Sequence, residues 1–126
     1  MADLKLINMR DVEVESVSWL WYPFIPYGKV TIIQGDPGEG KTTLVLQIIA
    51  RLTKGRSIID KKELSPINVI YQTAEDGLAD TIKPRLLSAN ADCSKVLVID
   101  DRDTPLTMRD VRLEQAIVET NAKLVV

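Results

Sequence analysis

The chain of 126 residues has no histidine and a single cysteine, Cys93. These absences exclude disulfide frameworks, zinc sites built from cysteine and histidine, and general-base catalysis by an imidazole. Any chemistry carried out here must therefore use lysine, threonine and carboxylate side chains.

Long hydrophobic runs and an excess of positive charge are also missing. No apolar run approaches the roughly 18 residues of a membrane span, and the first residues, MADLKLINMRDVEVE, lack the apolar core of a signal peptide. The net charge of −2 and the pI near 5.1 provide no overall attraction to nucleic acid or to an anionic membrane. These values do not exclude a local stripe of basic residues. We therefore expect a cytoplasmic protein without a membrane partner.

What is present is an ordinary globular composition, with 45% hydrophobic and 27% charged residues. From about Lys29 onward, apolar runs of strand length alternate with amphipathic stretches of helix length, which predicts an α/β fold with a mostly parallel sheet covered by helices. The expected domain organisation is an extended segment, 1–28, packing on a core, 29–126. The strands are expected at 29–34, 67–73, 95–100 and 123–126.

The first helix is expected over 41–54. Its polar stripe consists of Gln47, Arg51 and Lys54, spaced i, i+4 and i+7, and Gly55 is placed to end it. Nearly the whole of this helix is therefore expected to pack against protein.

The second helix is expected over 78–91, with Leu78, Ile82 and Leu86 on one apolar face. Pro84 lies inside this range, so it either kinks the helix or marks its true beginning.

The third helix is expected to begin at a capping box formed by Thr107 and Asp110 and to run to about Asn121. The last strand then starts at Lys123, and the sequence stops at Val126 inside an apolar run. A natural terminus avoids leaving a strand unfinished, so the sequence is expected to be C-terminally incomplete.

The N-terminal segment is rich in aromatic residues. We expect these rings to pack between segments of the chain, and stacking of one ring on a nucleotide base is the alternative. The residues concerned are Trp19, Trp21, Tyr22, Phe24 and Tyr27.

The most specific signal is QGDPGEGKTT, which satisfies G-x-x-x-x-G-K-[ST] directly after an expected strand and before an expected helix. Glycines let successive backbone N–H groups point at one anion, and the positive end of the following helix adds to the attraction. Lys41 is expected to reach the β and γ phosphates of ATP and Thr42 to ligate Mg²⁺. The expected nucleotide-binding residues are Gly35, Asp36, Pro37, Gly38, Glu39, Gly40, Lys41 and Thr42.

Hydrolysis requires a group that orients water beside the γ phosphate, and Glu75 is the first candidate. It follows the expected strand 67–73, and ligand crevices of parallel sheets lie at the carboxyl ends of strands. A solvated loop carboxylate is the alternative for Glu75. Its neighbour Asp76 is expected to cap the next helix.

Two positions are candidates for the acid that holds Mg²⁺ through a water molecule. Asp100 or Asp101 ends the apolar run KVLVIDD, whereas a residue beyond Val126 would end the last strand; the second reading is preferred, with both aspartates on a loop. Arg85 could contact a phosphate, although a single arginine on a helix is usually solvated.

The stretches WLWYPFIPYGKVTIIQGDPGEGKTTL and VIYQTAEDGLADTIKPRL resemble the RecA-like P-loop ATPases of the replicative-helicase and RepA type, which are often carried by plasmids, phages and integrated elements. The resemblance covers about residues 17–126. It implies an ATP-binding glycine loop, an acid after the second strand that positions water, and a later strand that ends in a Mg²⁺-associated aspartate.

Lys41, Thr42 and Glu75 match this family pattern position by position, and Thr43 matches a common α-phosphate contact. The resemblance implies the ATP-binding core of a helicase-type motor in DNA replication or a related DNA transaction. It also implies a ring of identical subunits in the parent protein, with DNA contacted through downstream regions rather than this sequence. We therefore expect 1–126 to bind ATP and Mg²⁺ with little hydrolysis. A P-loop small-molecule kinase and a nucleotide-dependent regulatory switch are the alternative functions.

Overall fold

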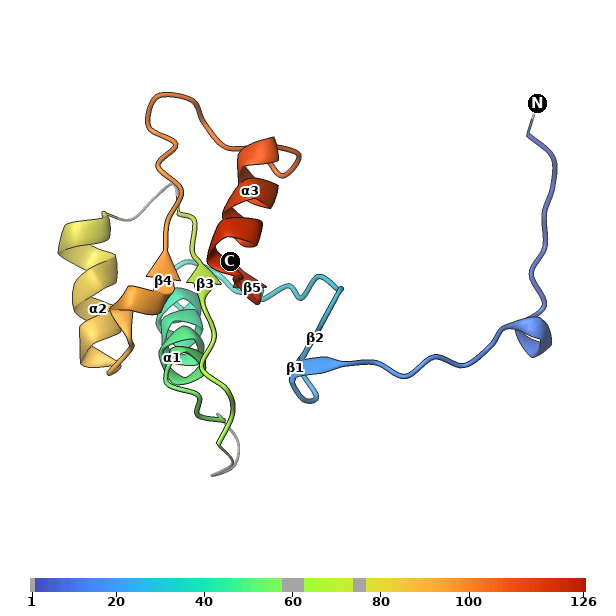
Figure 1. Ribbon diagram of the computed structural model, residues 1–126, viewed down its shortest axis with the longest axis horizontal. Helices are drawn as coiled ribbons and strands as arrows, with labels where there is room; N and C mark the ends of the chain where they lie inside the picture. Colours follow the sequence, from blue (N-terminus) through green and yellow to red (C-terminus); the bar gives the residue numbers. More distant parts are fainter. Residues whose placement is uncertain (1, 58–62, 74–76) are drawn as a thin grey trace. The chain divides into compact units, whose positions relative to one another are not determined.

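The computed structural model describes residues 2–57, 63–73 and 77–126. The chain divides into two compact units, Met1–Ile32 and Ile33–Val126, and each is described by itself. Both are drawn in Figure 1, coloured along the sequence.

The N-terminal unit contains a short 3₁₀ helix, Met9–Asp11, and an antiparallel pair of strands, β1 (Trp19–Trp21) and β2 (Ile25–Pro26). The aromatic side chains of this hairpin contact one another. The rings of Trp19 and Tyr22 meet edge to face at 5.1 Å, and those of Trp21 and Phe24 lie 4.7 Å apart. These aromatic side chains therefore pack against one another within the hairpin.

The second unit contains a parallel sheet of three strands in the order β4-β3-β5. β3 (Val69–Ile70) lies between β4 (Val96–Leu97) and β5 (Leu124–Val125), so its side chains are buried. The parallel arrangement confirms the α/β class. Three of the four expected strands are therefore present, each shorter than its apolar run.

The expected strand at 29–34 is a wrong prediction. The structure has no strand over these residues, and Val30 and Ile32 are 85% and 72% exposed. β-branched residues favour strands only when a neighbouring strand completes the hydrogen bonds of the ladder. Composition alone could not show whether such a partner is there.

Helix α1 (Lys41–Thr53) provides the largest part of the core, because Leu46, Ile49 and Leu52 are fully buried. The polar stripe is confirmed, since Gln47, Arg51 and Lys54 are all exposed. Lys54 and Gly55 end the helix, and Gly55 adopts a positive φ of 71°. Leu44, near the start of the helix, is an exception to the expected coverage, because it is 51% exposed.

The second expected helix is divided into a π-helical turn, Leu78–Ile82, and helix α2 (Lys83–Ser88). Pro84 lies in the first turn of α2 and so marks the beginning of the α-helix, as one of the two readings predicted. Ile82 and Leu86 are buried as expected, whereas Leu78 is exposed. The wider π-helical turn changes the residue spacing, and Leu78 therefore leaves the apolar face.

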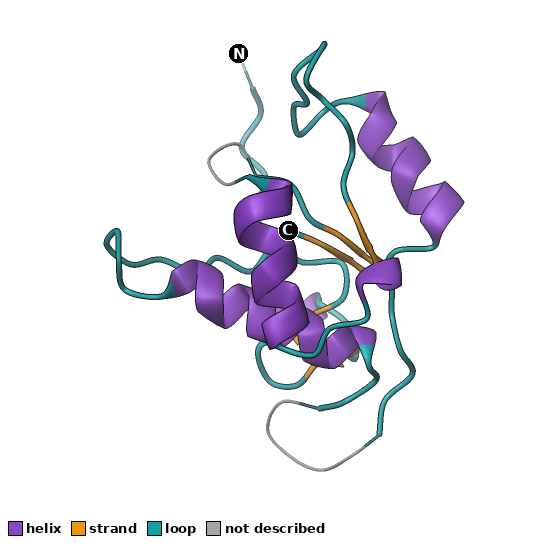
Figure 2. Ribbon diagram, turned by 90° about the vertical axis from the view of Figure 1, so that its left-hand side faces the viewer, coloured by secondary structure: helices purple, strands orange, loops and turns teal. Residues whose placement is uncertain are grey.

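Helix α3 (Val111–Thr120) begins later than the expected capping box. Asp110 is the N-cap, and its carboxylate accepts a hydrogen bond from the N–H of Arg112, whereas Thr107 accepts through its backbone carbonyl from Asp110. Asn121 ends the helix in the left-handed conformation. α1 and α2 pack together, and α3 lies apart from both (Figures 1 and 2).

Candidate functional site

The glycine loop leads directly into the first turn of α1. Gly38 and Gly40 have φ values of 85° and 86°, a left-handed conformation that other residues adopt only with strain. The loop thereby bends onto the helix N-terminus, where the first N–H groups have no partner within the helix. This arrangement can bind an anion such as a phosphate.

Side chains of the loop hold it in a closed turn. The Nζ of Lys41 donates a hydrogen bond to the carbonyl oxygen of Gly35, and the N–H of Asp36 donates to Oε2 of Glu39 at 2.9 Å. A Cβ atom at Gly35 would lie 2.7 Å from the same Glu39 oxygen and would displace the end of this exposed side chain. The structure thus brings Lys41 into contact with the glycine loop, as the sequence motif predicted.

Two threonines follow the lysine. Thr42 is half-buried, and its hydroxyl forms no hydrogen bond within the part of the chain that the structure describes, so it is available to a ligand. Thr43 is exposed and lines a hollow of about 320 Å³ between α1 and α2. Arg85 lines the same hollow from α2, which places a cation beside the residue that follows the glycine motif.

The candidate water-positioning acid, Glu75, and its neighbour Asp76 lie outside the described residues. The structure describes the chain up to Thr73, just beyond β3, and again from Gly77. The roles of Glu75 in catalysis and of Asp76 in capping therefore stay predictions.

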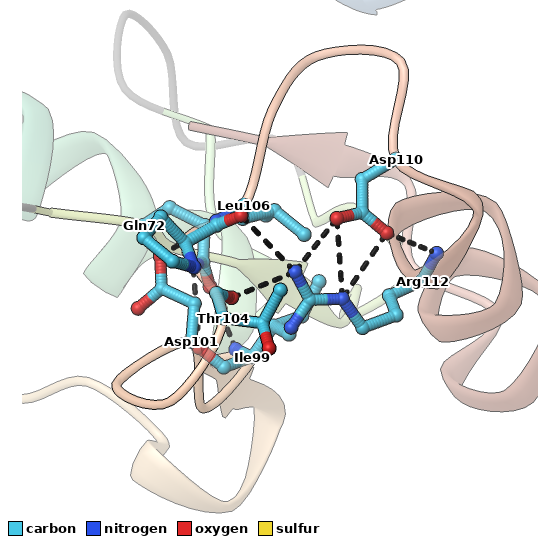
Figure 3. A network of polar contacts seen from close by, with 8 residues as sticks. Gln72, Ile99, Asp101, Thr104, Leu106, Asp110 and Arg112 are labelled. Carbon is cyan, nitrogen blue, oxygen red and sulfur yellow. Dashed lines mark hydrogen bonds and ion pairs between the residues drawn. The ribbon is translucent and has the colours of Figure 1, made fainter.

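Sequence reasoning missed Gln72, which follows β3. Its side-chain oxygen accepts from the N–H of Ile99 at 2.6 Å, and its Nε2 donates to the carbonyl of Ile99 at 3.2 Å (Figure 3). Its own N–H donates to the carbonyl of Val126 at 2.8 Å. Gln72 thus connects the ends of three strands. The sequence could have indicated this role, because a polar residue stands directly after a buried strand.

The two candidate metal acids at the end of β4 have partners on their own loop. Asp100 forms an exposed ion pair with Arg102 at 2.6 Å, and hydrogen bonds from Arg102 lower the pKa of Asp100 to about 2. Asp101 accepts a hydrogen bond from the N–H of Leu106 at 3.3 Å. Among the described residues, no group of three or more acidic, cysteine or histidine side chains could hold a metal ion.

The loop between β4 and α3 is attached to the helix by Arg112 (Figure 3). Its guanidinium forms an ion pair with Asp110 at 2.6 Å and donates to the carbonyl of Thr104 at 2.8 Å. Hydrogen bonds from Arg112 also lower the pKa of Asp110. The pair is largely shielded from solvent and holds the loop over the start of α3.

No helix in the described ranges is long and apolar enough to cross a membrane.

Comparison with known proteins places this geometry in a family. The sequence model of the AAA domain family matches residues 3–126. The chain is also similar to the DNA repair protein RadA of Halalkalibacterium halodurans, with 33% identity over 100 residues. That match covers 79% of this chain and 18% of RadA, so the chain spans about a fifth of that relative's length. No solved structure matches the chain.

The family match and the relative support the interpretation of the glycine loop as part of a P-loop ATPase of the RecA-like kind. ATPases of this kind generally use ATP and Mg²⁺. The half-buried Thr42 hydroxyl, which has no partner among the described residues, the Lys41 ammonium and the helix amides agree with that use. From the match over nearly its whole length, the chain belongs to the AAA domain family.

Proposed function

We propose that this chain is the ATP-binding core of a RecA-like ATPase that acts on DNA, as a helicase-type motor in replication or a related transaction. The observation that carries the proposal is the closed glycine loop, with Lys41 bonded across it to Gly35 at the N-terminus of α1. Nucleotide phosphates would take the place of the Gly35 carbonyl as the partner of Lys41.

Different residues of the loop would contact different parts of the nucleotide. Backbone N–H groups from Gly38 to Thr43 would surround the β and γ phosphates, and Thr43 would reach the α phosphate. The Thr42 hydroxyl would hold Mg²⁺, which neutralises charge on the phosphate oxygens when it is bound. Asp36, Pro37 and Glu39 would shape the loop.

Hydrolysis is assigned to Glu75, whose carboxylate would orient the attacking water, with Lys41 stabilising the charge that develops on the transferred phosphoryl group. The support for Glu75 is its place in the sequence shortly after β3, because ligand crevices of parallel sheets lie at the carboxyl ends of strands. The acid that associates with Mg²⁺ is either Asp100 or Asp101 or a residue beyond Val126, and the ion pair of Asp100 with Arg102 favours the last of these.

Action on DNA is supported by the similarity to RadA, which is named a DNA repair protein. In the complete protein we place the principal DNA contacts outside residues 1–126 and expect several identical subunits to form a ring. The chain itself would then supply the nucleotide site of each subunit.

The test is a titration of the chain with ATP and Mg²⁺, followed by calorimetry and by the amide signals of an NMR spectrum. Shifts are expected at Gly38 to Thr43, and Lys41→Ala should weaken binding about ten- to a hundredfold, because a charge-assisted contact of roughly 1.5 to 3 kcal/mol is lost. Lys83→Ala is the control, because Lys83 is exposed at the start of α2. Equal affinity of both variants would refute the site.

A further inference from the structure

The polar stripe of α1 has no role in the nucleotide site. Gln47, Arg51 and Lys54 are exposed along one side of the helix, in the direction that leads away from the glycine loop. Seven residues of α-helix separate the first from the last, a distance of about 10 Å. The stripe is therefore an extended surface feature and needs an explanation of its own.

Neighbouring elements turn the stripe into a groove. Arg51, Lys54 and Arg56 line a hollow of about 110 Å³ together with Gln47 and with Asn90, which follows α2. Two small residues, Ala50 and Ala89, also line this hollow.

Gln47 also lines the larger hollow that contains Arg85, so the two hollows share this residue. We call the two neighbouring hollows together the basic groove. It is defined by Gln47, Asn90 and four cations: Arg51, Lys54, Arg56 and Arg85.

The positive charge of the basic groove is not neutralised by the described chain. None of its four cations forms an ion pair with a described carboxylate. Glu63 pairs with Arg56 through the backbone alone. The charge of Lys54 contributes to the lowered pKa of Asp92, but it is the smallest cause, and the largest is a hydrogen bond with Ser94.

We propose that the basic groove binds successive phosphate groups of a single nucleic-acid strand. Three of its four cations are arginines, whose guanidinium groups donate two parallel hydrogen bonds to phosphate, and the amides of Gln47 and Asn90 add neutral donors. The lining contains none of the aromatic anchors that are enriched in protein–protein interfaces. Phosphates, rather than a protein segment, therefore match this chemistry.

The salt dependence and the affinity of this binding can be estimated from three or four phosphate contacts. Each contact contributes about −0.7 to the slope of log K against log salt for a single strand, which gives about −2 to −3 for the groove. Affinity at physiological salt should be in the nonspecific range of about 10⁻⁴ to 10⁻⁶ M. The groove is thus an accessory surface that adds to stronger contacts elsewhere.

The experiment measures the anisotropy of a fluorescent twelve-residue oligothymidylate during titration with the full chain, at several salt concentrations and with the nucleotide site saturated by Mg²⁺-ATP. Arg51→Ala combined with Lys54→Ala should lower the slope by about 1.4, the contribution of two phosphates. Lys5→Ala combined with Lys123→Ala changes the net charge equally at exposed positions outside the groove and should leave the slope unchanged.

The binding measurements would overturn the proposal in four cases: absence of binding, an unchanged slope in the groove variant, an equal decrease in the control, or competition by hexaglutamate as strong as that by the oligonucleotide. Amide shifts at Gln47, Ala89 and Asn90 on addition of the strand would support it independently. Shifts confined to Gly38 to Thr43 would assign the binding to the nucleotide site instead and so refute it. Both double variants replace exposed side chains, and their melting temperatures show whether the fold is kept.

Discussion

The ammonium of Lys41 is bonded to the carbonyl oxygen of Gly35, six residues earlier and at the other end of the glycine loop. The loop is therefore closed before any phosphate arrives, and the lysine has a polar partner that a phosphate can replace. Binding then exchanges one hydrogen bond for a stronger, charge-assisted one. A loop already closed loses little conformational freedom when the ligand binds, which favours affinity.

Gly40→Ala tests the requirement for a left-handed residue at the start of α1. The φ of 86° would strain an alanine by about 1 to 2 kcal/mol, and relaxation of that strain would turn the N–H groups away from a bound phosphate. We expect a lower melting temperature and at least a tenfold loss of ATP affinity, measured by scanning and titration calorimetry.

Gly28→Ala is the matched control for this variant. Gly28 has a φ of 71°, and a Cβ there would meet no atom within 4 Å, so the strain is similar but lies outside the loop. It should destabilise the protein without weakening ATP binding. A Gly40→Ala variant with unchanged affinity would show that the loop does not need this conformation.

Glu75→Gln separates nucleotide binding from hydrolysis. The amide keeps the size of the side chain and removes the negative charge that would orient and activate water. In a form of the protein that turns over ATP, phosphate release should decrease by orders of magnitude while ATP affinity stays the same. Asp76→Asn makes the same chemical change at the neighbouring residue and should retain most turnover. If Glu75→Gln also retains it, another acid positions the water.

Gln72→Ala removes both side-chain hydrogen bonds to the backbone of Ile99. Since these groups are partly buried, we expect a loss of about 1 to 3 kcal/mol in the free energy of unfolding. The measurement is urea unfolding followed by circular dichroism. Gln115→Ala replaces an exposed glutamine on α3 and should change stability little. Equal effects of the two variants would mean that the bridge between the strand ends contributes nothing measurable.

The stability of the chain should decrease in acid through Asp110. Its pKa in the folded state lies below the unfolded value of about 3.9, because Arg112 stabilises the carboxylate. The stabilisation is therefore complete above about pH 4 and is lost as the pH falls through the folded pKa. Urea unfolding between pH 5 and pH 2.5 measures this loss, and Asp110→Asn should make the dependence less steep.

Asp100→Asn is the control for the pH experiment. Asp100 has a pKa of about 2, but its ion pair with Arg102 is exposed, and such pairs contribute little to stability. The pH dependence of this variant should stay close to that of the unchanged protein. A larger effect at Asp100 than at Asp110 would contradict the assignment of the acid sensitivity to the shielded pair.

Several features could be predicted because they depend on neighbours in the sequence. The bounds of α1 and its exposed polar stripe follow from helical spacing, and the glycine loop follows from a motif with a defined backbone geometry. Pro84 at the start of α2 is likewise a local effect of the missing N–H group. The parallel sheet follows from alternating strand-like and helical segments.

Other features required the tertiary structure. The run 29–34 has strand composition and forms no strand, and only the folded chain shows whether an apolar run has a partner. Gln72 meets Ile99 from 27 residues away, and Arg85 comes beside Thr43 only because α1 and α2 pack together. By itself, the sequence determined the loop and the faces of its helices, because backbone geometry and periodicity are local. Which side chains and strands meet depends on the packing of distant segments, and the tertiary structure alone decided it.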